Sequence, residues 1–109
     1  MQLQSFPFQT LNWSSIPKEE HKGITGIAYW QVFIMNDIRV RLVEYSPNYM
    51  ADHWCSKGHI ILCVEGEMET ELQDGRKFIL AKGMTYHVGD HNEAHRSSSQ
   101  KGCTLFIVD

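Results

Sequence analysis

Hydrophobic and polar residues alternate along most of the chain from Gly26 onward, in short segments that turn-forming residues interrupt. Aromatic and β-branched residues fill segments 27–35 and 38–45, and Asn36-Asp37 between them is typical of a hairpin turn. Shorter strands of similar character are predicted at 59–64, 68–72, 78–80, 84–88 and 104–108. Many short strands separated by Gly and Asp indicate an all-β sandwich or barrel.

The two central strands differ in the faces that they bury. In one of them, Met68, Thr70 and Leu72 alternate with glutamates, which predicts one buried and one solvated face. The other, 59–64, carries apolar residues at both parities, so its outer face also needs a cover. We expect a turn at 65–67 between the two strands. We also expect a second subunit, or the N-terminal segment, to cover the outer face.

Residues 1–25 show no strand-like alternation and are expected to form an irregular lead-in. Ser15 before Pro17 predicts one helical turn, because serine caps helices and proline suits their first turn. Phe6, Phe8 and Trp13 are expected to cover an open edge or the mouth of the barrel. A chain of 109 residues has the size of one domain, so we divide it into the lead-in, 1–25, and a barrel, 26–109.

Composition and charge indicate which partners and which cellular compartment to expect. Hydrophobic residues make up 42% and charged residues 21% of the chain, as in ordinary soluble globular proteins. A net charge of −3 argues against a nucleic-acid partner, and no apolar stretch is long enough to span a membrane. The first residues lack the basic region and apolar core of a signal peptide, so we expect a cytoplasmic protein. Its three cysteines are then free thiols or metal ligands rather than disulfides.

A group of metal-binding residue types begins at His53. In a strand, His53 and Cys55 point to the same face, and His59 opens the next strand after a tight turn. Since neighbouring strands lie about 4.8 Å apart, the three side chains can converge on one ion at about 2.0–2.3 Å. A single His or Cys is more often a packing residue, but the pattern His-x-Cys-x-x-x-His before an apolar strand favours a metal site. Cys63 and Cys103 are assigned to packing. A fourth ligand is available from His87, His91 or His95.

The spacing of these residues resembles the first motif of the cupin superfamily. That motif reads Gly, five residues, His-x-His, three or four residues, Glu, six residues, Gly. From the first histidine onward the corresponding positions here are His53, Cys55, His59 and Gly66. Cys55 replaces the second histidine of the motif, His59 replaces its glutamate, and its opening glycine is absent.

The second cupin motif is matched more loosely. It reads Gly, five residues, Pro-x-Gly, two residues, His, three residues, Asn. Gly83 and Gly89 fit it, His95 comes one residue late, and no asparagine follows at the expected place. The resemblance therefore implies His95 as the fourth ligand, with His91 as the alternative.

A narrower resemblance concerns small bacterial proteins with a DHCW-motif cupin fold, although the order here is Asp-His-Trp-Cys. It covers roughly residues 26–109 and rests on segments 51–55, 66–72 and 105–109. The resemblance implies an all-β, single-domain double-stranded β-helix, a jelly-roll-like barrel with the metal near one mouth. A thiolate with imidazoles favours zinc, iron, nickel or copper over magnesium or calcium.

The sequence leaves the activity open between two main classes. One is a metal-dependent enzyme that oxygenates or isomerises a small molecule, with Tyr86, Arg41 and Glu93 as candidate pocket residues. The other is a non-catalytic module that binds or senses a small-molecule ligand, and a third reading makes Cys55 an oxidation sensor. In each case we expect a homodimer, because two-fold dimers are the commonest oligomers and the outer face of 59–64 is apolar.

Overall fold

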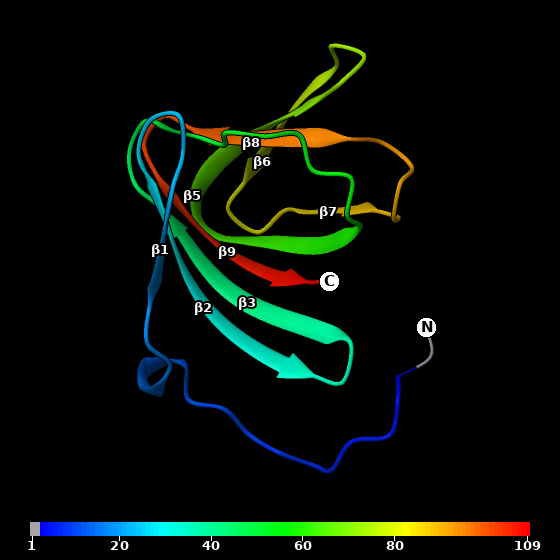
Figure 1. The fold of residues 1–109 in the computed structure, drawn as a ribbon. Helices are drawn as coiled ribbons and strands as arrows, with labels where there is room; N and C mark the ends of the chain where they lie inside the picture. Colours follow the sequence, from blue (N-terminus) through cyan, green and yellow to red (C-terminus); the bar gives the residue numbers. More distant parts are fainter. Residues whose placement is uncertain (1–2) are drawn as a thin grey trace.

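The structure, a computed structural model, describes residues 3–109 and is all-β apart from one turn of 3-10 helix (Figure 1). Its strands form one curled antiparallel sheet in the order β1-β2-β3-β9-β5-β8-β4, with β6 and β7 pairing to β5. No helix in residues 3–109 has the length and apolar character needed to cross a membrane. In chain order the elements are η1 (Trp13–Ser15), β1 (Glu19–Lys22), β2 (Ile27–Met35), β3 (Ile38–Tyr45), β4 (Tyr49–Met50), β5 (His59–Leu72), β6 (Lys77–Ala81), β7 (Thr85–Val88), β8 (His95–Ser99) and β9 (Cys103–Val108).

β2 and β3 form the hairpin that the alternation predicts. Met35 lies opposite Ile38, and Asn36 in the turn has a φ of 54°, which asparagine adopts more readily than most residues. β9 pairs with the other edge of β3, and β5 pairs with the other edge of β9. The predicted strands at 78–80, 84–88 and 104–108 are confirmed as β6, β7 and β9, with ends that differ by one residue at most.

β5 is one long curved strand, so the prediction of two strands with a turn at 65–67 is wrong. A register shift against β9 between Cys63 and Glu65, followed by Gly66 at a φ of 74°, bends the strand without ending it. A Cβ at Gly66 would lie 2.4 Å from the carbonyl oxygen of Gly102, so the bend requires glycine. The first half of β5 pairs with β7 and β9 and the second half with β6 and β8, which curls the sheet into a half-barrel (Figure 1).

The core lies on the concave side of the sheet. Met68 and Leu105 are fully buried there, and Thr70 is buried too, while the glutamates between Met68 and Leu72 face outward, as predicted. In the first half of β5, inward residues are buried and outward ones are exposed by 36–42%. The outward residues are Ile60, Leu62 and Val64.

The lead-in is more ordered than expected. Its helical turn is Trp13–Ser15, with Asn12 rather than Ser15 as its N-cap, and Glu19–Lys22 forms β1 against β2. Residues 19–22 were expected to be irregular, but Lys22 opposite Ile27 continues the β2 ladder. Trp13 packs edge-on against Phe106, with 6.5 Å between ring centroids, on the outer face of the sheet.

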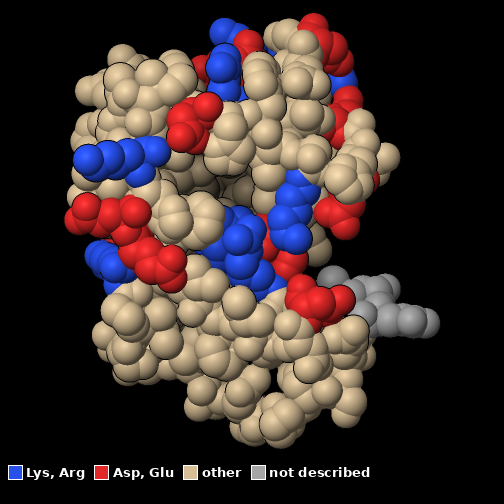
Figure 2. Space-filling model, viewed as in Figure 1, with Lys and Arg blue, Asp and Glu red and all other residues tan. Residues whose placement is uncertain are grey.

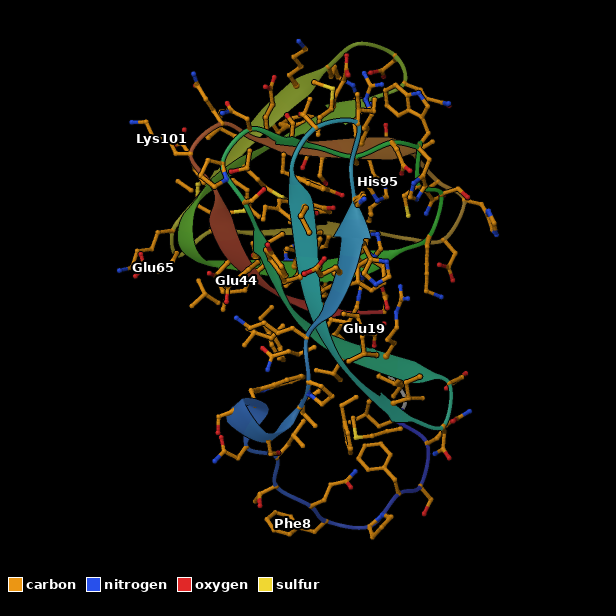
Figure 3. The ribbon with its side chains drawn as sticks, turned by 60° about the vertical axis from the view of Figure 1, so that its left-hand side comes forward. Phe8, Glu19, Glu44, Glu65, His95 and Lys101 are labelled. Atoms are coloured by element: carbon orange, nitrogen blue, oxygen red, sulfur yellow. The ribbon has the colours of Figure 1, made fainter. Side chains whose placement is uncertain are left out.

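The uncharged part of the lead-in covers the outer face only in part. Residues 3–17 carry no charged side chain, and Figure 2 shows the lower part of the molecule almost free of charge on the face drawn. Phe8 is 95% exposed and lies in the part of the lead-in that is farthest from the barrel (Figure 3), so its predicted covering role is wrong. Residues 1–2 of the predicted lead-in lie outside the described residues.

β4 and β8 were not predicted. β8 reads His-Arg-Ser-Ser-Ser, which lacks the apolar residues that mark a strand. Its pairing with the second half of β5 places Leu72 opposite His95, and a single bridge places Cys55 opposite the same histidine. This polar strand therefore positions the candidate site.

Candidate metal centre

Three of the four predicted ligands meet at one point inside the mouth of the half-barrel. Cys55 and His95 face each other across two backbone hydrogen bonds of 2.8 and 2.9 Å, and His59 begins β5. The ligand atoms of the three residues all lie within 4.8 Å of one another, and Cys55 Sγ is 3.5 Å from His59 Nε2. Two metal–ligand bonds of about 2.0–2.3 Å span at most about 4.6 Å. The group therefore needs only a small adjustment to bind one ion.

Hydrogen bonds fix which nitrogen of each histidine is available. His95 Nδ1 donates to the carbonyl oxygen of Glu93 at 2.9 Å, and His59 Nδ1 donates to Asp109 Oδ2 at 2.7 Å. Because a carbonyl and a carboxylate can only accept, the neutral form of each ring carries its proton on Nδ1 and keeps a lone pair on Nε2. Both Nε2 atoms belong to the cluster side of the rings, whose centroids are 5.0 Å apart.

His95 Nε2 is buried and has no hydrogen-bond partner among residues 3–109. Such an atom costs about 1–3 kcal/mol unless something satisfies it. Burial lowers the pKa of His95, the nearby His59 lowers it further, and the hydrogen bond to Glu93 opposes both. A neutral imidazole with a buried lone pair beside a thiol and a second imidazole is the donor set of a transition-metal site, so these residues fit such an ion.

A buried carboxylate orients His59. The Asp109 side chain is 0% exposed and accepts hydrogen bonds from His59, from Arg39 through two nitrogens at 2.8 and 3.1 Å, and from Arg41 at 2.7 Å. Burial alone raises the pKa of Asp109. The hydrogen bonds from His59 and Arg39 and the positive charges of both arginines outweigh burial and hold the pKa far below its usual range. A carboxylate behind a ligand histidine is a common partner of metal sites.

The cluster opens into a cavity of about 270 Å³ on the concave side of the sheet. Figure 2 shows a hollow at the centre of the molecule, above a group of Lys or Arg side chains. Aromatic and basic residues dominate the walls of the cavity around the three ligands. They include Trp30, Arg39, Arg41, Tyr45, Tyr86 and Arg96.

His53 is not part of the cluster. It lines the same cavity, but its side chain is 74% exposed and its Nδ1 lies 2.7 Å from Asp52 Oδ1. The reason is local: residues 52–53 form a bend rather than a strand, so the period of two that aligned His53 with Cys55 does not hold. His91, the alternative fourth ligand, is exposed in a turn with a φ of 58° and is not part of the cluster either.

The three predicted pocket residues have different positions. Arg41 lines the cavity and is 5% exposed, and the ring centroid of Tyr86 lies 6.1 Å from that of His95. Burial raises the pKa of Tyr86 well above its usual value, so its hydroxyl stays protonated. Glu93 is exposed and pairs with Arg76 at the rim of a second, more apolar cavity of about 290 Å³, which shares Tyr86 and His95. Only its backbone carbonyl contacts the site.

Sequence reasoning missed Asp109, Arg39 and Trp30. Arg39 and Arg41 share one strand face at a spacing of two, and that pattern was a usable signal. Asp109 follows directly on β9, and only the pairing of β9 with both β3 and β5 places its carboxylate between arginines and histidine. No local pattern marks it.

Neither a protein-family model nor a curated protein matches the sequence, whereas solved structures do. A predicted oxalate decarboxylase from Thermotoga maritima is 14% identical over 92% of this chain and 96% of that chain, with a TM-score of 0.77. An Fe(II)-HppE bound to the alternative substrate (S)-1-HPP is 12% identical over 94% of this chain and 60% of that chain, with a TM-score of 0.76. A cupin-2 domain containing protein from Shewanella frigidimarina is 19% identical over 73% of this chain and 78% of that chain, with a TM-score of 0.60.

These likenesses show the fold. The chain is a single all-β domain whose curled antiparallel sheet matches cupin structures, as the sequence motifs implied. At the mouth of that sheet stands a Cys/His/His group that could hold a metal ion.

Proposed function

We propose that Cys55, His59 and His95 bind a divalent transition metal, and that the protein is a metal-dependent enzyme of the oxygenase or isomerase type that acts on a small molecule. The observation that carries this proposal is the buried, unpartnered Nε2 of His95 beside Cys55 Sγ and His59 Nε2. A buried lone pair with no partner is unfavourable unless an ion or donor occupies the space in front of it. The resemblance in segment 51–55 further supports membership of the DHCW-motif group.

The donor set favours zinc, iron or nickel. One thiolate and two imidazoles suit these metals better than magnesium or calcium. Three protein ligands leave at least one coordination position open, which is typical of catalytic rather than structural sites. His53 lines the same cavity and stays our candidate for a fourth ligand, since rotation of an exposed side chain costs little. With four protein ligands the tetrahedral shell of zinc would be full, whereas six-coordinate iron or nickel would keep two positions open.

When bound, the metal would supply a Lewis acid that polarises an oxygen of the substrate. The residues of the chain do the rest. Asp109 and the carbonyl of Glu93 hold the two ligand histidines in the required tautomer and orientation. His59 and His95 are buried in the barrel wall, and the protonated hydroxyl of Tyr86, which lines the same cavity, is a hydrogen-bond donor.

We also propose that the protein is a homodimer that buries the outer face of β5. Ile60, Leu62 and Val64 leave an apolar row exposed there, and the lead-in packs on Phe106 of the neighbouring strand instead. Contiguous exposed apolar surface of this kind is typical of interaction sites.

Metal content and metal affinity test the proposal together. Protein purified without an affinity tag should contain close to one equivalent of a transition metal by element-resolved mass spectrometry. After chelation, His95→Ala should reduce zinc affinity about a hundredfold or more, whereas His87→Ala, at an exposed histidine outside the cavity, should leave it nearly unchanged. Equal affinity of wild type and His95→Ala would refute the site.

Turnover separates an enzyme from a binding module. Small-molecule mixtures incubated with the metal-loaded protein under air and under nitrogen should show substrate loss that His95→Ala abolishes. Tight binding of a ligand without turnover, across several metals, would favour the non-catalytic module.

A further inference from the structure

The guanidinium group of Arg41 has spare hydrogen-bond donors. Asp109 uses two nitrogens of Arg39 but only Nη2 of Arg41. The Arg41 side chain is only 6% exposed, and its Nε is buried with no hydrogen-bond partner among residues 3–109. Each guanidinium carries five N–H donors, and a buried cation with unused donors is unfavourable unless an acceptor comes to it.

The Arg41 guanidinium group lies over the ring of Trp30. The ring lies 4.4 Å from the Arg41 guanidinium carbon and 5.5 Å from that of Arg39, and it lines the same cavity. A cation stacked on an aromatic ring keeps its in-plane N–H groups free and holds them in one orientation. Arg41 is therefore preorganised to receive a planar anion.

The charge balance of the cavity is positive. Three arginines line it, Asp109 is shared between Arg39 and Arg41, and Glu71 pairs with Arg96. A divalent ion with one thiolate ligand would add a further positive charge. Asp109 is fully occupied by its existing donors and uses only Nη2 of Arg41, so an incoming anion would bind the Arg41 donors that Asp109 leaves unused.

We propose that the cavity binds a small carboxylate, with its carboxylate group on the free donors of Arg41 and the rest of the molecule toward Cys55, His59 and His95. Arg41 and His59 both bond to Asp109 Oδ2, each at 2.7 Å, so the bound anion would lie next to the metal ligands. A cavity of about 270 Å³ holds roughly nine water molecules at about 30 Å³ each, which fits a short-chain acid rather than a large cofactor. This assignment of substrate class rests on the proposed function for its metal contact, but not for its anion contact.

Nuclear magnetic resonance of the tryptophan indole groups tests the proposal in the wild-type protein. The chain has three tryptophans, and only Trp30 lines the cavity. Trp13, which packs against Phe106 on the outer face, is the internal control, whereas Trp54 lies against Arg96 of the cavity wall and is not used as one. Lactate should shift the Trp30 indole signal with saturation, and lactamide, its neutral match, should not. The shift should occur both in chelator-treated protein and in zinc-loaded protein.

Substitutions identify the donor. Arg41→Gln should weaken lactate binding about tenfold to a hundredfold, since a charged hydrogen bond is lost. Arg76→Gln, an arginine outside this cavity, should leave it unchanged. If Arg41→Gln does not fold, Arg41→Lys keeps the charge without the planar fork and should still weaken binding, and the comparison of lactate with lactamide needs no variant.

Three results would overturn the proposal: equal shifts with lactamide, no saturable shift with lactate, or a shift that requires zinc. The last result would mean that the carboxylate binds the metal rather than Arg41. If lactate binds in an Arg41-dependent way but zinc does not bind, the proposed metal function fails and the anion site stands.

Discussion

Replacement of Asp109 by asparagine tests the arrangement behind the candidate metal centre most directly. Asp109→Asn keeps the shape of the side chain and removes the negative charge that faces Arg39, Arg41 and His59. The side chain is 0% exposed and that of Arg41 only 6%, so bulk water screens the remaining positive charges poorly. Removal of one partner from a buried ion pair costs about 3–5 kcal/mol.

This loss is large compared with the stability of a domain of this size, which is about 5–15 kcal/mol. It should lower the urea midpoint of the metal-free protein by about 1 M or more. Asp74→Asn removes an exposed carboxylate that also pairs with an arginine, Arg76, and is the matched control. We expect the midpoint of that variant to equal that of the wild type.

The same substitution should weaken zinc binding about tenfold to a hundredfold, because His59 loses the charged partner that fixes its tautomer. Competition with a chromophoric chelator measures this affinity at a pH where both variants are folded. A wild-type urea midpoint in Asp109→Asn would refute the role of the carboxylate in balancing the arginines. Lower stability with unchanged zinc affinity would refute its role in orienting His59.

Three further predictions follow from the same structure. Cys55→Ser should weaken zinc affinity far more than Cys63→Ser or Cys103→Ser, because the sulfurs of Cys63 and Cys103 are buried in the core. Parallel chelator competitions measure the zinc affinity of the three variants. The pKa of Asp109 in the folded protein lies below its unfolded value of about 3.9. The stabilisation from Asp109 should therefore be complete above about pH 4 to 5 and decrease as the pH falls further. Urea midpoints measured against pH should show a weaker acid dependence in Asp109→Asn than in the wild type. Leu62→Lys should convert the proposed homodimer to a monomer in light scattering, and an intact dimer would place the interface elsewhere.

The alternation of apolar and polar residues was sufficient to locate the strands in which it is clear. Period-two burial and the turn residues beside it predicted the hairpin of β2 and β3, the outward glutamates of β5 and the strands β6, β7 and β9. Local patterns missed β4 and β8 because those strands are short or polar, and pairing with neighbours decides their conformation. The bend within β5 resembled a turn, because Gly66 serves equally well in a turn and in a bulge.

The candidate site divides in the same way. The spacing of Cys55 and His59 and the cupin resemblance for His95 identified three residues that the fold brings together. The sequence could not show that residues 52–53 bend and turn His53 outward, since strand parity assumes a strand. Asp109 binds His59 from 50 positions away, and such long-range contacts depend on which strands become neighbours. Sequence thus determined which residue types are available, and the tertiary pairing of β3, β9, β5 and β8 decided which of them meet, because side-chain periodicity fixes a face but not the strand opposite it.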